Sequence, residues 1–171
     1  LAPGISSLTL HPQLGIWSWA RYDTRLMESI APGDLRTWVT SYISAHEKDL
    51  GVSVDQVVWP EDQSELTGFG SLRMLHLTRN VSGVPVKGAY LQLSFAKQED
   101  GRFRLRELLN NGYGPITFKT DGQMPSLAEA LAVTGLADAS IQHIKPWIVP
   151  KPQAEGPYKF VLAHEYQLLA A

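Results

Sequence analysis

Apolar residues recur at helical spacing in the segment between residues 34 and 51. The positions are Leu35, Trp38, Val39, Tyr42, Ile43, His46 and Leu50. This spacing places them on one face of a helix. Asp34 stands where an N-cap residue is expected, and Gly51 stands where a helix C-terminal glycine is expected. The pattern therefore predicts an amphipathic helix from Asp34 to Leu50.

After this helix the period of the apolar pattern changes from 3.6 to 2, which is typical of β-strands. The alternation predicts strands at Leu72–Asn80, Val84–Phe95 and Arg102–Leu109. Ser82-Gly83 and Asp100-Gly101 are turn sequences between them. Short turns favour an antiparallel meander, and we expect the preceding helix to cover one of its faces.

The two ends of the chain predict further elements. Trp17 and Trp19 indicate a short extended piece with both rings on one face, and we interpret residues 1–30 as an N-terminal arm. Near the other end, Ser126 and Glu129 fit a capping box that begins a short helix, to about Val133. Strands are expected at residues 142–149 and 158–168, on either side of a proline-rich loop.

Composition limits the classes of function. The chain has 171 residues, of which 44% are hydrophobic, and it carries 15 basic and 17 acidic side chains. This length fits one domain or two small ones. The net charge of −2 argues against a nucleic-acid partner, and no apolar run reaches the ~20 residues of a membrane span. The absence of cysteine excludes disulfides and Cys-ligated metals.

No catalytic or cofactor motif stands out. His46-Glu47 and His164-Glu165 begin like a zinc-peptidase helix, which needs a second His four positions after the first. Those positions hold Leu50 and Leu168. No serine is flanked two residues away by glycine on both sides, and no phosphate loop is present. We expect a protein without catalytic residues, metal or cofactor.

A row of arginines is the less ordinary feature. Arg102, Arg104 and Arg106 alternate along one predicted strand, so their side chains are expected on one face of the sheet. Arg79 lies on a neighbouring predicted strand. Two interpretations stay open at this point: an ordinary solvated face, or a docking surface for an acidic partner, where charge steers association.

The central segment resembles a known family. Residues 75–91 include Gly83-Val84-Pro85-Val86 between two predicted strands, and this run resembles the fungalysin/thermolysin propeptide (FTP) domain. Lys48-Asp49-Leu50-Gly51-Val52 is similar to the end of that domain's helix, and residues 15–20 are similar to the N-terminal arm of bacterial members. Residues 125–168 resemble the PepSY-type domain that commonly follows. Arg79 takes a position where the family usually has Gln.

The resemblance implies an α+β fold of two small cystatin-like units, each a helix packed on an antiparallel sheet. Residues 1–30 would be the arm, residues 31–119 the FTP-like helix plus meander, and residues 120–171 the PepSY-like helix plus strands.

The function that the resemblance implies is that of a propeptide of a secreted zinc metallopeptidase. Such a propeptide inhibits the catalytic domain, assists its folding, and is exported with it to the periplasm or outside the cell. Candidate contacts are Arg79, Arg102, Arg104 and Arg106. Two alternatives stay open: a stand-alone exported binding module of the same fold, and a small hydrolase.

Overall fold

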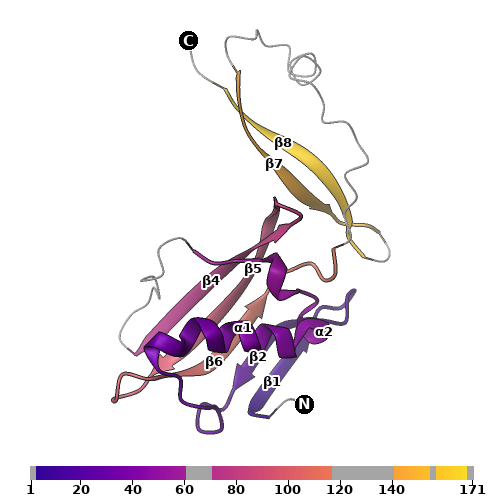
Figure 1. The fold of residues 1–171 in the computed structure, drawn as a ribbon. Helices are drawn as coiled ribbons and strands as arrows, with labels where there is room; N and C mark the ends of the chain where they lie inside the picture. The colour runs from indigo at the N-terminus through magenta and orange to yellow at the C-terminus, as the bar shows by residue number, and fades with distance from the viewer. Residues whose placement is uncertain (1–2, 61–70, 117–140, 155–156, 169–171) are drawn as a thin grey trace.

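The computed structural model describes residues 3–60, 71–116, 141–154 and 157–168, with side chains left out at 141–144, 164 and 166–168. The elements are β1 (Ile5–Leu10), β2 (Trp17–Tyr22), η1 (Pro32–Asp34), α1 (Leu35–Ala45), α2 (Glu47–Leu50), η2 (Val54–Gln56), β3 (Val57–Val58), β4 (Leu72–Val81), β5 (Val84–Lys97), β6 (Phe103–Asn110), β7 (Ile141–Lys151) and β8 (Lys159–Leu168). Figure 1 shows their arrangement.

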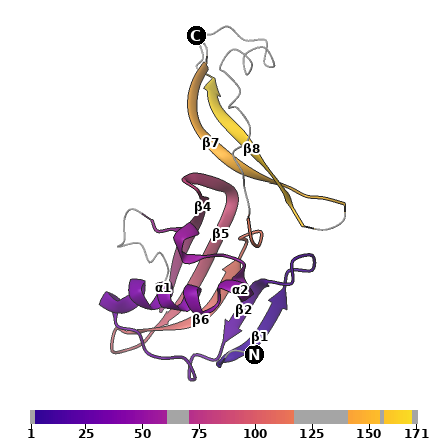
Figure 2. The ribbon, with the colours of Figure 1, turned by 45° about the vertical axis from the view of Figure 1, so that its right-hand side comes forward.

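The described strands form one mixed sheet. Six of them follow the order β1-β2-β6-β5-β4-β3 with antiparallel pairing, and together with the helices we call them the body. β7 pairs with β5 in parallel at Val86↔Ile148, and β8 pairs with β7. β7 and β8 make a long two-stranded ribbon that projects from the body beside the tip of the β4–β5 hairpin (Figures 1 and 2). We call the pair of strands β7 and β8 the ribbon.

The predicted helix is confirmed, and it packs on one face of the sheet as expected. α1 begins after Asp34, whose side chain makes no capping bond, and α2 ends at Gly51 in the left-handed conformation, with φ 63°. His46, with φ −116°, separates the two helices. Leu35, Val39 and Ile43 are buried against the sheet.

The predicted meander is also confirmed. β4, β5 and β6 pair in sequence order, through turns at Ser82-Gly83 and Asp100-Gly101. Ser82 and Gly83 both have positive φ, 52° and 83°. This is the combination that a two-residue type I′ turn requires.

Residues expected to form an arm supply two strands of the body, and the expected placement of the tryptophans is wrong. β1 pairs with β2, and the register shifts between Thr9 and Leu10, which pair with Trp19 and Trp17. Such a shift inserts one residue and reverses the side chains beyond it. Trp17 is buried and packs against the His46 ring, with the centroids 5.0 Å apart and the planes tilted by 38°. Trp19 instead donates from Nε1 to Oε1 of Glu107 at 2.5 Å.

Two groups of buried apolar residues hold the fold. The large one fills the body between α1 and the sheet, and Leu77, Leu93 and Phe95 are fully buried in it. The small one lies where the ribbon meets the body. Its members are Val81, Val86, Ala89, Ile116 and Ile148.

The expected division into two cystatin-like units, each with its own helix and sheet, is wrong. The strands expected near 142–149 and 158–168 exist as β7 and β8, but they extend the same sheet. The reason is the length of β5, which pairs with β7 at Val86 and with β6 from Leu91 onward. One strand therefore serves both parts. The helix expected at Ser126–Val133 lies outside the described residues.

Candidate functional site

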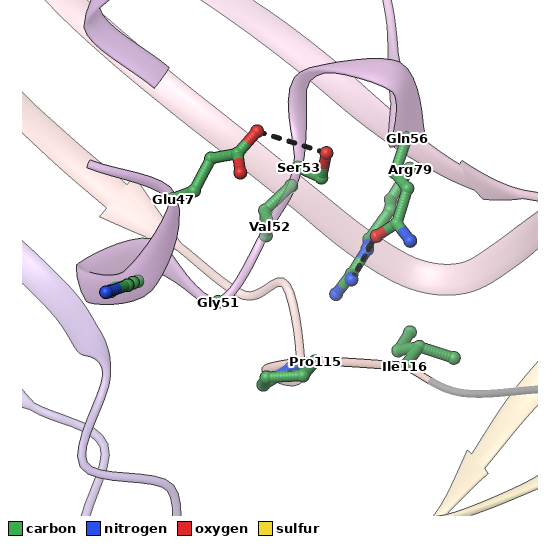
Figure 3. Close-up of a pocket in the computed structure, with 9 residues that line it drawn as sticks. Glu47, Gly51, Val52, Ser53, Gln56, Arg79, Pro115 and Ile116 are labelled. Atoms are coloured by element: carbon green, nitrogen blue, oxygen red, sulfur yellow. Dashed lines mark hydrogen bonds between the residues drawn. The ribbon is translucent and has the colours of Figure 1, made fainter. Parts of the chain in front are cut away.

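The most developed polar site lies below the C-terminal end of α2. Four parts of the chain meet there: the α2–η2 segment, β4, the end of β6 and residues 111–116. Its centre is Arg79 of β4, whose exposed fraction is 3%. Figure 3 shows the Arg79 side chain reaching toward the space bounded by Val52, Pro115 and Ile116.

The guanidinium of Arg79 is held by neutral acceptors. Its Nε donates to Oε1 of Gln56 at 3.1 Å, and Nη2 donates to the same oxygen. Its Nη1 donates to the carbonyl oxygen of Gly114 at 2.6 Å and to that of Gly112. These bonds fix the loop after β6 against β4 and η2. Among the described residues no carboxylate forms an ion pair with Arg79.

Asn110 connects the other side of the same loop. Its Nδ2 donates to the carbonyl oxygens of Trp17 at 2.7 Å and Leu50 at 2.8 Å. Its Oδ1 accepts from the backbone N–H of Gly112 at 2.8 Å. A buried amide with three such bonds is well satisfied, so Asn110 joins β2, α2 and the loop at one point.

Gly51 is required by the close approach of this loop to the helix end. It combines positive φ with packing so tight that an added Cβ would lie 2.8 Å from Cα of Gly114. A side chain here meets both backbone strain and a collision with backbone.

A pocket of about 290 Å³ opens beside Arg79. Val52, Pro115 and Ile116 give it apolar walls, and Glu47 and Lys48 contribute charged groups. The Glu47 carboxylate already accepts from the Ser53 hydroxyl at 3.1 Å and the Val54 N–H at 3.3 Å. A pocket with apolar walls and one buried cation can bind a small anionic group that carries an apolar tail.

Burial sets the electrostatics of Arg79. Loss of solvent lowers the pKa of its guanidinium to about 10, while the charge of Asp55 acts in the opposite direction. Arg79 therefore stays protonated at neutral pH, as a cation in a poorly solvated place.

The structure separates the four arginines that the sequence suggested as partner contacts. Arg79 lies inside the site just described. Arg102 donates from Nε to the Ser29 hydroxyl at 3.0 Å, and Arg104 donates from Nη1 to the carbonyl oxygen of Thr24 at 3.1 Å. Arg106 is exposed.

A β-bulge lies at the end of the expected arginine row. Ser94 pairs with Glu107, and the next residue, Phe95, pairs with Leu105, so Arg106 is an extra residue without a partner position. The alternation holds up to the bulge, because Phe103 and Leu105 are buried while Arg102, Arg104 and Arg106 are not, and it changes only from Glu107 onward.

The Gly83-Val84-Pro85-Val86 run lies at the junction between body and ribbon. Gly83 completes the β4–β5 turn, and Val86 is buried and pairs with Ile148 of β7. Next to this pair, the Trp147 ring has the Nζ of Lys87 4.5 Å and the Nζ of Lys145 4.4 Å from its centroid.

The same ring also makes a hydrogen bond within the ribbon. Trp147 Nε1 donates to Oε2 of Glu165 at 2.5 Å. Tyr158 adds an edge contact to Tyr113, with ring centroids 5.0 Å apart. Within the described residues, the ribbon is thus held to the body by one strand pair and a few side chains.

Sequence reasoning missed the pocket. Arg79 follows Leu75 and Leu77 at period 2, so the same alternation that buried those leucines indicated an inward-facing arginine. Gln56 and Asn110 had no such signal, because they bind groups far away in the sequence: Gln56 accepts from the Arg79 guanidinium, and Asn110 donates to the carbonyl oxygens of Trp17 and Leu50.

Two negative findings concern the described residues. They contain no group of three or more His, Asp or Glu side chains placed to hold a metal ion. None of their helices is long and apolar enough to span a bilayer.

Comparisons with known proteins give one distant similarity. No family model matches the chain. No curated protein matches it. Among solved structures, the Bacillus megaterium YpeB C-terminal domain is similar, with a TM-score of 0.43 and 14% sequence identity, over 89% of this chain and 61% of that one. The chain thus spans about three fifths of the length of that structure. A similarity at this level carries no statement about function, and the FTP resemblance stays a hypothesis.

Proposed function

We propose that the chain is a protein-binding prodomain of a secreted or periplasmic zinc metallopeptidase of the thermolysin/fungalysin kind. In this proposal it inhibits the catalytic domain and assists its folding, and it takes no part in the chemistry. The observation that carries the proposal is the ribbon, a projecting strand pair placed directly beside the Gly83-Val84-Pro85-Val86 motif.

The ribbon supports protein binding through its free backbone. Within the described residues β8 pairs with β7 alone, so its outer edge has unpaired N–H and C=O groups. An extended segment of a partner can add to such an edge as a further strand. A two-stranded ribbon is marginally stable by itself, so the partner's contact would stabilise it.

The attachment of the ribbon supports the same interpretation. Ile148 is buried in the small cluster beside Val86, but the neighbouring side chains Trp147 and Val149 are only half-buried. This leaves apolar surface for a partner next to the free edge. A stable inhibitory interface needs more than about 1,000 Å² of buried surface, so the face of the body that bears Arg106 is proposed to contribute as well.

The alternative proposal keeps the binding surface and changes the partner. A stand-alone exported module would use the same ribbon edge for another protein, because strand addition is read mainly through the backbone. The two proposals differ in whether this chain binds the peptidase.

An inhibition titration tests the prodomain proposal. The purified chain is mixed with the thermolysin-like peptidase of the same organism, and peptide cleavage is followed against chain concentration. We expect saturable inhibition at sub-micromolar concentration. Unchanged cleavage at tens of micromolar of folded chain, with folding verified by circular dichroism, would reject the prodomain and favour the module.

A charge variant with a matched control tests the proposed contribution of the body. Arg106→Glu reverses an exposed charge on β6, and Lys97→Glu makes the same change at the end of β5. We expect Arg106→Glu to weaken inhibition several-fold through slower association, and Lys97→Glu to leave it unchanged. Equal inhibition by both variants would remove Arg106 from the interface.

A further inference from the structure

We propose that the pocket beside Arg79 binds an aliphatic carboxylate, whose oxygen accepts a hydrogen bond from the Arg79 guanidinium. The site lies between α2, η2 and residues 115–116. The inference goes beyond the prodomain proposal and does not depend on it.

The first reason is an uncompensated charge. Arg79 is 3% exposed, and the acceptors that it contacts are the amide of Gln56 and two backbone carbonyls. A buried cation is costly unless an anion accompanies it. Asp55 favours the charged form of Arg79 from a distance, without an ion pair within the described residues. A carboxylate in the pocket would supply the missing direct partner.

The second reason is a donor that remains unused. A guanidinium has five N–H groups. The contacts to Gln56, Gly112 and Gly114 engage one N–H of Nε, both of Nη1 and one of Nη2. The second N–H of Nη2 has no acceptor among the described residues. One free charged donor fits one carboxylate oxygen.

The apolar walls of the pocket favour an aliphatic group next to the carboxylate of the ligand. Val52, Pro115 and Ile116 present apolar surface, and the volume of about 290 Å³ has room for a short aliphatic chain. Lys48 is exposed at the pocket and adds positive charge. The Glu47 carboxylate faces the pocket too, but its contacts with Ser53 and Val54 hold it in place.

The same features disfavour phosphate. A phosphate group has several charged oxygens, which need several donors. Besides the exposed Lys48, the pocket offers one free N–H of Arg79, and Glu47 would repel a doubly charged ligand more strongly than a singly charged one. A monocarboxylate on an apolar chain matches both the charge and the walls.

Nuclear magnetic resonance of the full chain tests the inference. The Nε–H signal of Arg79 is assigned by its loss in Arg79→Lys, and sodium valerate is titrated at constant ionic strength, with valeramide as the uncharged control. We expect a saturable shift of this signal with valerate in the millimolar range. The affinity for valeramide should be weaker by about tenfold or more. Equal shifts with both compounds, or tighter binding of inorganic phosphate, would overturn the proposal.

A second pair of variants keeps the test decisive if Arg79→Lys does not fold. In that case the Arg79 signal is identified by through-bond assignment in the unsubstituted chain. Lys48→Glu reverses an exposed charge at the pocket, and Lys97→Glu reverses one far along β5. We expect Lys48→Glu to weaken valerate binding several-fold and Lys97→Glu to leave it unchanged. The same effect in both variants would contradict binding in this pocket.

Two peptide probes identify the source of the carboxylate. Acetyl-Ala-Val with a free C-terminus presents a chain-end carboxylate, and acetyl-Glu-N-methylamide presents a side-chain one. Tighter binding of either peptide than of valerate assigns the site to that part of a peptide. Tighter binding of valerate than of both assigns it to a free small carboxylic acid. Failure of all three to shift the Arg79 signal would refute the inference.

Discussion

The body and the ribbon are built from similar strands but are held in different ways. The body places α1 over the sheet and buries side chains from the helix and from β2, β4, β5 and β6 in one continuous core. The ribbon has strands of 11 and 10 residues, yet among the described residues it pairs with the body only at Val86↔Ile148 and otherwise contacts it through a small cluster and a few side chains. Strand length and pairing therefore do not measure how firmly a region is fixed.

Because of this difference, the body stabilises the fold while the ribbon is available for binding. A region with few buried apolar contacts opens at lower free energy than the core. The body can stay folded while the ribbon changes its contacts, which suits a domain that must engage a partner. The proposed prodomain function uses this contrast, because the stable region carries the less stable region as a binding element.

The largest expected effect comes from the centre of the body. Phe95 is fully buried and packs edge-on against Trp38 and Phe103. Phe95→Ala should lower the free energy of unfolding by about 3–5 kcal/mol, because it leaves a cavity in the core. Urea denaturation followed by tryptophan fluorescence measures this loss. A loss below about 1 kcal/mol would mean that the body is not packed as described.

The next effect should be local to the ribbon. Ile148 is fully buried, but only in the small cluster. Ile148→Ala should weaken the docking of the ribbon by about 2–4 kcal/mol, which appears as faster amide hydrogen exchange in β7 and β8. Exchange in α1 and β5 beyond Leu91 should not change. Equal acceleration in both regions would show that they unfold as one unit.

A glycine pair tests the tight contact between helix end and loop. Gly51→Ala should cost about 2 kcal/mol, since positive φ and the approach of Gly114 both oppose a Cβ. Gly83→Ala is the matched control: φ is 83°, but no atom lies within 4 Å of the added carbon, so about 1 kcal/mol is expected. Thermal unfolding of both variants measures the difference. Equal losses of stability in the two variants would show that the close approach of Gly114 adds nothing to the cost of a side chain at Gly51.

The smallest effect concerns an exposed ion pair of the body. The hydrogen bonds from Arg25 hold the pKa of Asp23 at about 2, below its ordinary value of 3.8. A lowered pKa stabilises the folded chain above pH 3.8, and this contribution disappears as the pH falls toward 2. Arg25→Ala should return the pKa of Asp23 toward 3.8 in a carboxyl resonance titration. Stability at pH 7 should barely change, because exposed pairs contribute little.

The sequence predicted those features that depend on neighbouring residues. The spacing from Leu35 to Leu50, the glycine at Gly51 and the turns at Ser82 and Asp100 act over a few residues, and the elements that they indicated exist. The N-cap shows the limit of this reasoning, because Asp34 occupies the position without making the bond.

The features that depend on distant partners were missed. The parallel pair Val86↔Ile148 joins residues far apart in the chain, so nothing local showed that the C-terminal strands extend the first sheet. The bulge at Arg106 similarly depends on its register with Ser94 and Phe95. Of the candidate site, the alternation of β4 indicated the inward direction of Arg79, but not the loop carbonyls that receive its hydrogen bonds.

The most direct test of the account is hydrogen exchange of the chain with and without the thermolysin-like peptidase. The account predicts rapid exchange in the free ribbon, and strong protection of Lys159–Leu168 in the complex, with little change in α1. Protection confined to α1, with β8 still exchanging rapidly in the complex, would contradict the claim that the ribbon is the binding element.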